Sequence, residues 1–238
     1  MKMRLDKLLS ATGTATRSEA SRAARKGRIA LNGVICTDVS RQIDPEADIV
    51  EFDGQRILYQ QYYYILLNKP EGYVSATEDL KEKTVLELLP ENLRSLGLFP
   101  CGRLDKNTVG LMLLTNNGDL GHKLLSPKYH VSKKYRYTAK FPLLEADIER
   151  LEQGVSILDG YMTLPAKLYP DDDTSSGEIE ITEGKYHQIK LMFDAVGNKI
   201  TSLERITFGP LCKDESLARG EWRELTEAEV TALENHCR

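Results

Sequence analysis

The sequence has few residues of the kinds that hold metals or build disulfide scaffolds. Its cysteines are widely spaced and form no C-x-x-C pair, which argues against a zinc site and against a secreted disulfide framework. The histidines also lack the spacing of metal ligands. We therefore expect no metal. The few residues concerned are Cys36, Cys101, Cys212, Cys237, His122, His130, His187 and His236.

Long apolar runs are missing as well. No stretch approaches the roughly 18 uninterrupted apolar residues of a membrane-spanning helix. The first ten residues, MKMRLDKLLS, lack the apolar core of a secretory signal. The sequence therefore predicts a cytoplasmic protein with no membrane partner.

The chain also has no overall excess of positive charge, because its formal net charge is −4. Its basic residues are nevertheless concentrated locally. Residues 1–28 hold eight basic residues against two acidic ones, and residues 120–144 hold six basic residues and no acidic one. Two cationic segments on an acidic protein indicate a polyanion bound at defined places. The alternative reading, two solvated faces, stays open on charge alone.

Residues 1–59 have the pattern of a separate small domain. Apolar positions in residues 5–9 follow helical spacing, and Ser18 is a plausible N-cap for a second helix that Gly27 ends. Asn32-Gly33 and Asp53-Gly54 are typical hairpin turns. Residues 60–63 form a short linker at the start of a second domain, which spans residues 60–238.

The second domain shows no regular alternation of strands with crossover helices. This favours a mixed, largely antiparallel β-sheet with flanking helices, so the fold class is α+β. Strands are expected near residues 62–68, 98–101, 109–115, 135–141, 163–168 and 178–182, and helices near residues 85–89, 119–125, 144–153, 186–196 and 227–235.

The N-terminal segment resembles a known RNA-binding module. Its strings RLDKLL, RSEA and GRIALNGV match the alpha-L module found in ribosomal protein S-four along the length of that module. The resemblance implies that the basic second helix and the adjoining loop contact RNA phosphates, which positions a protein without reading sequence. The residues concerned are Arg17, Arg22, Arg25, Lys26 and Arg28.

The most unusual stretch of the second domain is CGRLDKNTVGLMLLTNNG, residues 101–118. Asp105 follows Arg103 by two residues, between a glycine turn and an apolar strand. Gly102 and Gly110 allow tight backbone geometry. A carboxylate with an arginine nearby suits a nucleophile or a base, although by itself the stretch is a weak signal, because most strings of this kind are turns.

Three motifs together resemble the pseudouridine synthases of the RsuA branch. The string in residues 101–118 matches their signature, NKPEGY at residues 68–73 matches their first motif, and residues 183–197 with 203–211 match their third. Their order and spacing agree over most of the second domain. The resemblance implies isomerisation of a uridine in ribosomal RNA. That reaction is neither redox nor hydrolytic, so we expect no cofactor.

The same resemblance implies roles for individual residues. Asp105 matches the catalytic aspartate, Tyr135 the tyrosine that stacks on the target base, and Lys190 the basic residue that pairs with the aspartate. Arg103 matches an arginine that helps to fill the space left by the flipped base. Leu191 stands where many relatives carry a second basic residue.

Other residues of this domain have less specific interpretations. Lys133 and Lys134 lie in the second basic segment and are expected to hold phosphates flanking the target. His187 is interpreted as a core or supporting histidine, because the implied reaction needs no imidazole. Lys69 is interpreted as a residue that fixes the end of a strand.

The expected substrate is one uridine of 16S ribosomal RNA, within a small-subunit assembly particle, and the expected state is a monomer. Two alternatives remain: the same chemistry on 23S ribosomal RNA, and a non-catalytic assembly factor that binds ribosomal RNA. A base in a stacked helix is unreachable, so the enzyme has to flip it at a cost of about a few kcal/mol.

Overall fold

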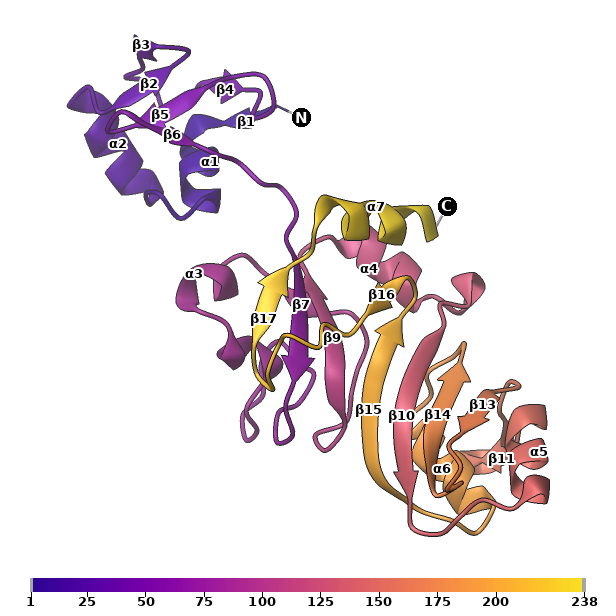
Figure 1. The fold of residues 1–238 in the computed structure, drawn as a ribbon. Coiled ribbons are helices and arrows are strands. Elements are labelled where there is room, and N and C mark those ends of the chain that lie inside the picture. The colour runs from indigo at the N-terminus through magenta and orange to yellow at the C-terminus, as the bar shows by residue number, and fades with distance from the viewer. Residues whose placement is uncertain (1, 237–238) are drawn as a thin grey trace. The chain divides into compact units, whose positions relative to one another are not determined.

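The computed structural model describes residues 2–236, and the chain folds into two compact units (Figure 1). The first unit ends at Tyr62 and the second begins at Tyr63. Each unit has a hydrophobic core of its own. None of the helices in residues 2–236 is long and apolar enough to cross a membrane.

The N-terminal unit packs two helices against short strands. Strand β1 pairs with β4, and a four-stranded antiparallel sheet has the order β3-β2-β5-β6. The elements of this unit are β1 (Met3–Arg4), α1 (Leu5–Ala11), α2 (Arg17–Arg25), β2 (Ile29–Leu31), β3 (Val34–Ile35), β4 (Gln42–Ile43), β5 (Val50–Phe52) and β6 (Gln55–Ile57).

Helix α2 begins two residues earlier than the sequence pattern indicated. Its N-cap is Thr16, not Ser18, because Thr16 and Glu19 form a reciprocal capping box. The helix buries Ala20, Ala23 and Ala24, and its arginines remain in solvent.

Both hairpin turns predicted from the sequence are confirmed. Asn32 and Gly33 have φ values of 52° and 78°, and Asp53 and Gly54 have 53° and 76°. Two successive positive φ values are the requirement of the two-residue turn that matches strand twist.

The C-terminal unit is built on a nine-stranded sheet whose main order is β13-β14-β10-β15-β9-β7-β17, with β16 on β15 and β8 on β9. Among the described strands, only β9 and β15 pair in parallel, so the expected mixed, largely antiparallel α+β fold is confirmed. The elements are β7 (Tyr64–Lys69), a 3₁₀ helix (Val85–Leu88), α3 (Glu91–Arg94), β8 (Phe99–Pro100), β9 (Val109–Thr115), α4 (Gly118–Leu125), a 3₁₀ helix (Pro127–Tyr129), β10 (Lys133–Ala139), α5 (Glu145–Gln153), β11 (Ser156–Ile157), a 3₁₀ turn (Leu158–Gly160), β12 (Tyr161–Met162), β13 (Lys167–Pro170), β14 (Ser176–Ile181), α6 (Gln188–Ala195), β15 (Ile200–Phe208), β16 (Leu211–Cys212), β17 (Trp222–Glu224) and α7 (Glu227–His236).

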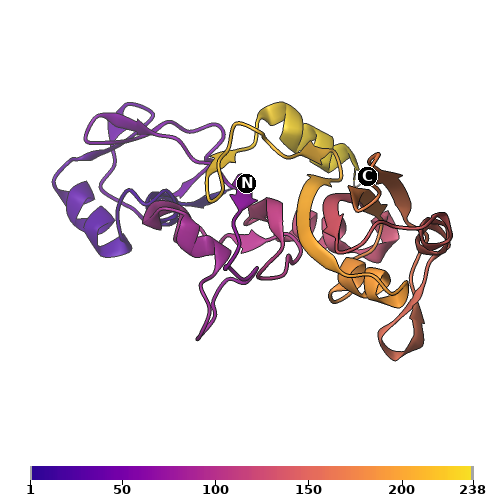
Figure 2. The ribbon, with the colours of Figure 1, turned by 60° about the horizontal axis from the view of Figure 1, so that its bottom comes forward.

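Both faces of the central strands are covered. Alternate residues of β7 enter different cores: Ile65 and Leu67 belong to the cluster that also includes residues of α6, whereas Tyr64 and Leu66 belong to the cluster that includes residues of α4 and α7. Figure 2 shows α6 in orange and α7 in yellow on opposite sides of the curved strand β15. A strand buried on both faces reads as an apolar run, which is how β7 was predicted.

In the C-terminal unit one predicted strand was misplaced, and five of the described strands were not predicted, namely β11, β12, β15, β16 and β17. The strand expected to begin at Thr163 begins at Lys167 instead, because Thr163 is tied to Val155 through hydrogen bonds in both directions. Strand β15 was not predicted, yet it joins β10 on one side to β9 on the other.

Candidate active site

Asp105 lies in the loop between β8 and β9, and the backbone of this loop is fixed from the β7 side. Ser75 Oγ donates to the carbonyl of Leu104 at 2.8 Å and accepts from the Leu104 N–H at 2.9 Å. The N–H of Gly72 donates to the carbonyl of Lys106 at 2.9 Å. The motif NKPEGY and the segment after it therefore hold the Asp105 loop.

Lys69 also holds this loop, through several hydrogen bonds from its ammonium group. Its side chain is fully buried, and its Nζ donates to the carbonyls of Asp105 at 3.0 Å and Thr108 at 2.8 Å, and to that of Pro70 at 3.1 Å. Burial lowers the pKa of Lys69 to about 8, and the charge of Asp105 opposes the shift. The sequence assigned Lys69 to a strand end, but the structure gives it the further task of pinning the loop.

Two side chains from the start of α6 contact the carboxylate of Asp105. Lys190 Nζ lies 2.5 Å from Oδ2, and His187 Nε2 lies 3.3 Å from Oδ1. Lys190 also donates to Asn107 Oδ1 at 2.7 Å. Lys190 thus pairs with one carboxylate oxygen, and the imidazole of His187 lies next to the other.

Helix α6 places Lys190 because its other face is buried. Ile189, Met192 and Phe193 pack in the core, which leaves Lys190 directed at the Asp105 loop. The helix begins at Gln188 rather than at Tyr186, since His187 adopts the left-handed conformation with φ 50°. Left-handed backbone is uncommon for residues other than glycine and is a known feature of functional sites.

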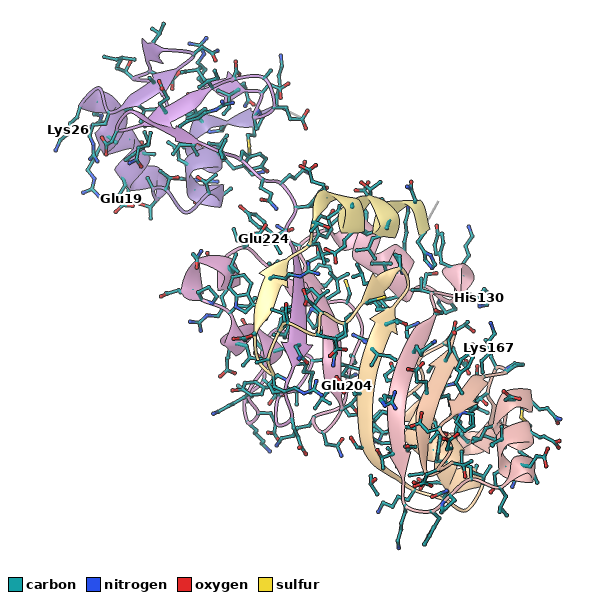
Figure 3. All side chains as sticks on the ribbon, in the orientation of Figure 1. Glu19, Lys26, His130, Lys167, Glu204 and Glu224 are labelled. Atoms are coloured by element: carbon teal, nitrogen blue, oxygen red, sulfur yellow. The ribbon has the colours of Figure 1, made fainter. Side chains whose placement is uncertain are left out.

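Asp105 opens onto a cavity of about 810 Å³, within the range of about 300–1,000 Å³ typical of ligand sites. Its wall includes Arg103, Lys133 and Tyr135. It also includes His130, which is labelled in Figure 3. The structure therefore brings all three residues assigned to catalysis, and two of those assigned to RNA, to one cavity.

Tyr135 and Arg205 lie deep in this cavity, with exposed fractions of 7% and 1%. Arg205 Nε donates to the carbonyl of Leu111 at 2.7 Å, and its guanidinium lies 5.0 Å from the centre of the Phe208 ring. Burial raises the pKa of Tyr135, against the charge and hydrogen bond of Arg205, so the phenol stays protonated at neutral pH.

Sequence reasoning missed Arg205 and undervalued His187. The signal for Arg205 was a lone arginine inside the otherwise uncharged string RITFGPL, where a buried strand would have an apolar residue. The signal for His187 was its place three residues before Lys190, one helical turn from a residue already assigned to the site.

The two lysines expected to hold phosphates differ in position. Lys133 is on the cavity side of β10, and burial lowers its pKa to about 8. Lys134 is absent from the cavity wall, because adjacent strand residues point to opposite faces. Its Nζ lies 3.3 Å from Glu178 Oε2 and 4.6 Å from the centre of the Tyr169 ring.

The basic residues assigned to the N-terminal unit are exposed. Arg17, Arg22, Arg25 and Lys26 belong to α2 and its C-cap, and Figure 3 shows Lys26 at the end of the helix pointing away from its unit. Arg28 differs from them, because both arms of its guanidinium donate to the carboxylate of Asp53.

Other chemistries find little support at this cavity. Cys101 is fully buried, and burial raises the pKa of its thiol to about 12, so it is no thiolate at neutral pH. Within residues 2–236, no cluster of histidine, cysteine and acidic residues could hold a metal ion.

Comparison with known proteins matches this site to a family. Residues 63–195 match the model of the RNA pseudouridylate synthase family, and residues 3–49 match the S4 domain. The first match covers more than half of the chain. The protein therefore belongs to the RNA pseudouridylate synthase family, which confirms the family and the enzyme class expected from the sequence motifs.

Three relatives are similar over nearly their whole lengths. The chain is 45% identical to "Uncharacterized RNA pseudouridine synthase YtzG" of Bacillus subtilis (strain 168), with 97% of this chain and 98% of that protein covered. It is 37% identical to "Ribosomal small subunit pseudouridine synthase A" of Escherichia coli (strain K12), with 97% and 100% covered. A solved structure named "Crystal structure of pseudouridylate synthase" matches with a TM-score of 0.69 at 37% identity, covering 97% of this chain and 99% of that one.

Proposed function

We propose that the protein isomerises one uridine of 16S ribosomal RNA to pseudouridine, with Asp105 as the catalytic carboxylate. The observation that carries the proposal is an aspartate held by Lys190 at the wall of a cavity that also contains Tyr135. The small-subunit target is supported by full-length similarity, at 37% identity, to a protein named ribosomal small subunit pseudouridine synthase A.

The reaction needs only groups that this cavity supplies. The bond between N1 of uracil and C1′ of the ribose breaks, the base turns, and a bond forms between C5 and C1′. The hydrogen on C5 is lost as a proton and N1 gains one, so atoms balance without a co-reactant. Asp105 acts as the nucleophile or as the base, and the cavity keeps the separated base and sugar in register.

The target uridine leaves its stack and enters the cavity. Tyr135 receives the base, with stacking worth about 1–3 kcal/mol against a flipping cost of about a few kcal/mol. Arg103 is exposed at the cavity wall and fills the space that the flipped base vacates. Lys133 supplies a positive charge for a phosphate next to the target.

Lys190 serves the reaction by orienting Asp105 and compensating its charge. An arginine would grip both carboxylate oxygens with one fork, whereas an ammonium contacts one oxygen. Here His187 contacts the other oxygen. The two residues together take the place of a bidentate arginine.

The N-terminal unit docks ribosomal RNA through Arg17, Arg22, Arg25 and Lys26. The proposal further takes the protein to act in the cytoplasm, as a monomer, on RNA in a partly assembled small-subunit particle. Activity on naked 16S RNA, on assembly intermediates and on complete subunits would distinguish these substrates, and sedimentation of the active enzyme would give its oligomeric state.

The proposal is tested by mapping pseudouridine in both large ribosomal RNAs of a strain that lacks the gene. We expect one 16S site to disappear on deletion and to return with the wild-type gene. Asp105→Asn should fail to restore it, because the amide is neither nucleophile nor base. Asp172→Asn is the matched control, since Asp172 is exposed and absent from the cavity wall.

Two results would contradict the proposal. Loss of a 23S site alone would move the substrate to the large subunit. Restoration of the 16S site by Asp105→Asn would remove Asp105 from catalysis.

A further inference from the structure

An aromatic pair stands at the edge of the cavity, immediately before α6. The rings of Tyr186 and His187 are stacked, with centroids 3.8 Å apart and planes 17° from parallel. Both residues line the cavity, yet the exposed fraction of Tyr186 is 66%. The Tyr186 ring is therefore accessible from outside the cavity, at its edge.

The loop that carries this pair is held rigidly. Glu183 accepts hydrogen bonds from Gln188 Nε2 at 2.7 Å, from the N–H of Leu164 at 2.9 Å and from the hydroxyl of Tyr161 at 2.7 Å. Gln188 Oε1 in turn accepts from the N–H of Lys185 at 2.9 Å. The rings are therefore pre-organised, which lowers the entropic cost of binding.

Tyr135 and Tyr186 both line the cavity but differ in how far they are exposed. Tyr135 is 7% exposed, so it can receive only a base that has entered the cavity. Tyr186 is accessible from outside. A third tyrosine at the cavity, Tyr161, already has the Lys185 ammonium 4.5 Å from the centre of its ring. Tyr186 is thus the ring available to a base that remains outside.

Flipping creates such a base. When the target uridine leaves its stack, each neighbouring nucleotide loses a stacking surface. An exposed aromatic ring can replace that surface for any of the four bases. Lys185 directly precedes the pair and is exposed, so a phosphate beside the neighbouring base would meet its positive charge.

We propose that the Tyr186–His187 pair is a second nucleobase platform, which stacks on a base adjacent to the flipped uridine in single-stranded RNA. This inference rests on the proposed function. Because His187 also contacts Asp105, the platform sets the distance along the RNA between the bound neighbour and the reacting uridine.

Steady-state kinetics on an RNA fragment that spans the mapped uridine separate a platform from a purely structural residue. For Tyr186→Ala we expect KM to rise about tenfold, the equivalent of one lost stacking contact, with kcat within about twofold, since uniform binding is what is lost. Tyr186→Phe keeps the ring and should behave as wild type. The matched control is Tyr169→Ala, another exposed tyrosine, which is absent from the cavity wall.

A binding measurement needs no turnover and locates the base. The Asp105→Asn enzyme is titrated with fragments that carry 2-aminopurine on the 5′ or the 3′ side of the target. We expect stacking to quench the 2-aminopurine fluorescence on one side of the target only. When Tyr186→Ala is combined with Asp105→Asn the quenching should be lost, and when Tyr186→Phe is combined with it the quenching should remain. The salt dependence of binding should not change, because a stacking contact releases no counterions.

The outcomes are distinguishable. Failure of the wild-type enzyme to form pseudouridine both in the fragment and in 16S RNA within assembly intermediates would contradict the proposed function or its target. Normal turnover with equal quenching in the Ala and Phe variants would overturn the platform. A Tyr186→Ala enzyme that loses kcat with KM unchanged would also overturn it, and would make Tyr186 a positioning residue for His187.

Discussion

Lys69 joins the stability of the protein to the geometry of its site. Its Nζ donates to the backbone carbonyls of Asp105, Lys106 and Thr108, and methionine in its place would remove all three bonds. The carbonyls of Asp105 and Lys106 would keep the N–H groups of Thr108 and Gly72, so the loss falls mainly on the carbonyl of Thr108. An unsatisfied buried acceptor costs about 1–3 kcal/mol. We therefore expect Lys69→Met to lower the free energy of unfolding by about this amount at pH 7.5. Fluorescence of Trp222, the single tryptophan, reports unfolding of the C-terminal unit in urea.

The difference in stability between wild type and Lys69→Met should also depend on pH. Burial lowers the pKa of Lys69 to about 8 from an ordinary value of 10.5. Between these values the unfolded chain binds the proton more tightly, so the stability that Lys69 contributes grows as pH rises above about 8 and is lost as pH falls through it. The difference in the free energy of unfolding between wild type and Lys69→Met should increase by about 1–2 kcal/mol from pH 7.5 to pH 9.5. A gap that narrows would contradict the buried position of this ammonium.

Lys133 and Lys134 offer a matched pair for testing which face of β10 meets RNA. Removing one phosphate contact should lower the salt slope of binding by about 1. We expect this for Lys133→Met, which loses a charge at the cavity, and little change for Lys134→Met, whose ammonium is paired with Glu178 on the other face. Equal effects on filter binding at several salt concentrations would show that RNA does not enter along the cavity face.

At the scale of elements, the parallel pairing of β9 with β15 depends on Gly110. A Cβ at this position would lie 2.3 Å from the carbonyl oxygen of Arg205, and the φ of Gly110 is +99°. Gly110→Ala should therefore destabilise the C-terminal unit by more than about 3 kcal/mol, since backbone overlap and strain add. Gly118→Ala is the control, because the space there is open and the residue is helical. Equal urea midpoints for the two variants would contradict this close packing.

Elements with strong local signals were predictable, and those set by distant partners were not. The buried strand β7 and the Asn32-Gly33 hairpin follow from apolar runs and turn chemistry. Strand β15 carries Glu204 and Arg205 at its centre, so no apolar alternation marks it, and its pairing with β10 and β9 determines its conformation. The same limit applies to the site. Family motifs indicated Asp105, Tyr135 and Lys190, whereas the contact of His187 and the burial of Arg205 arise only when α6, β9 and β15 meet.

At the scale of the whole molecule, the basic helix α2 and the Asp105 cavity lie on units with separate cores. Arg22 and Arg25 are exposed on α2. Replacing both with alanine should reduce the salt slope of RNA binding by about 1.5–2, as expected for two phosphate contacts, while the rate at saturating RNA stays the same. Arg28→Ala is the control, since Arg28 is paired with Asp53. A lower saturating rate with an unchanged slope would show that α2 does not dock the substrate.

The catalytic role proposed for Asp105 can be tested through the hydrogen on C5 of uracil, which pseudouridine formation must release. With 16S RNA tritiated at C5 of uridine, presented in the assembly state that supports turnover, we expect wild-type enzyme to release one equivalent of tritium from one site. Asp105→Asn should bind the RNA with affinity within about twofold and release none, because the cavity and the N-terminal unit are intact. Tritium release by Asp105→Asn, or stable binding without release by wild type, would contradict the assignment of this carboxylate to uridine isomerisation.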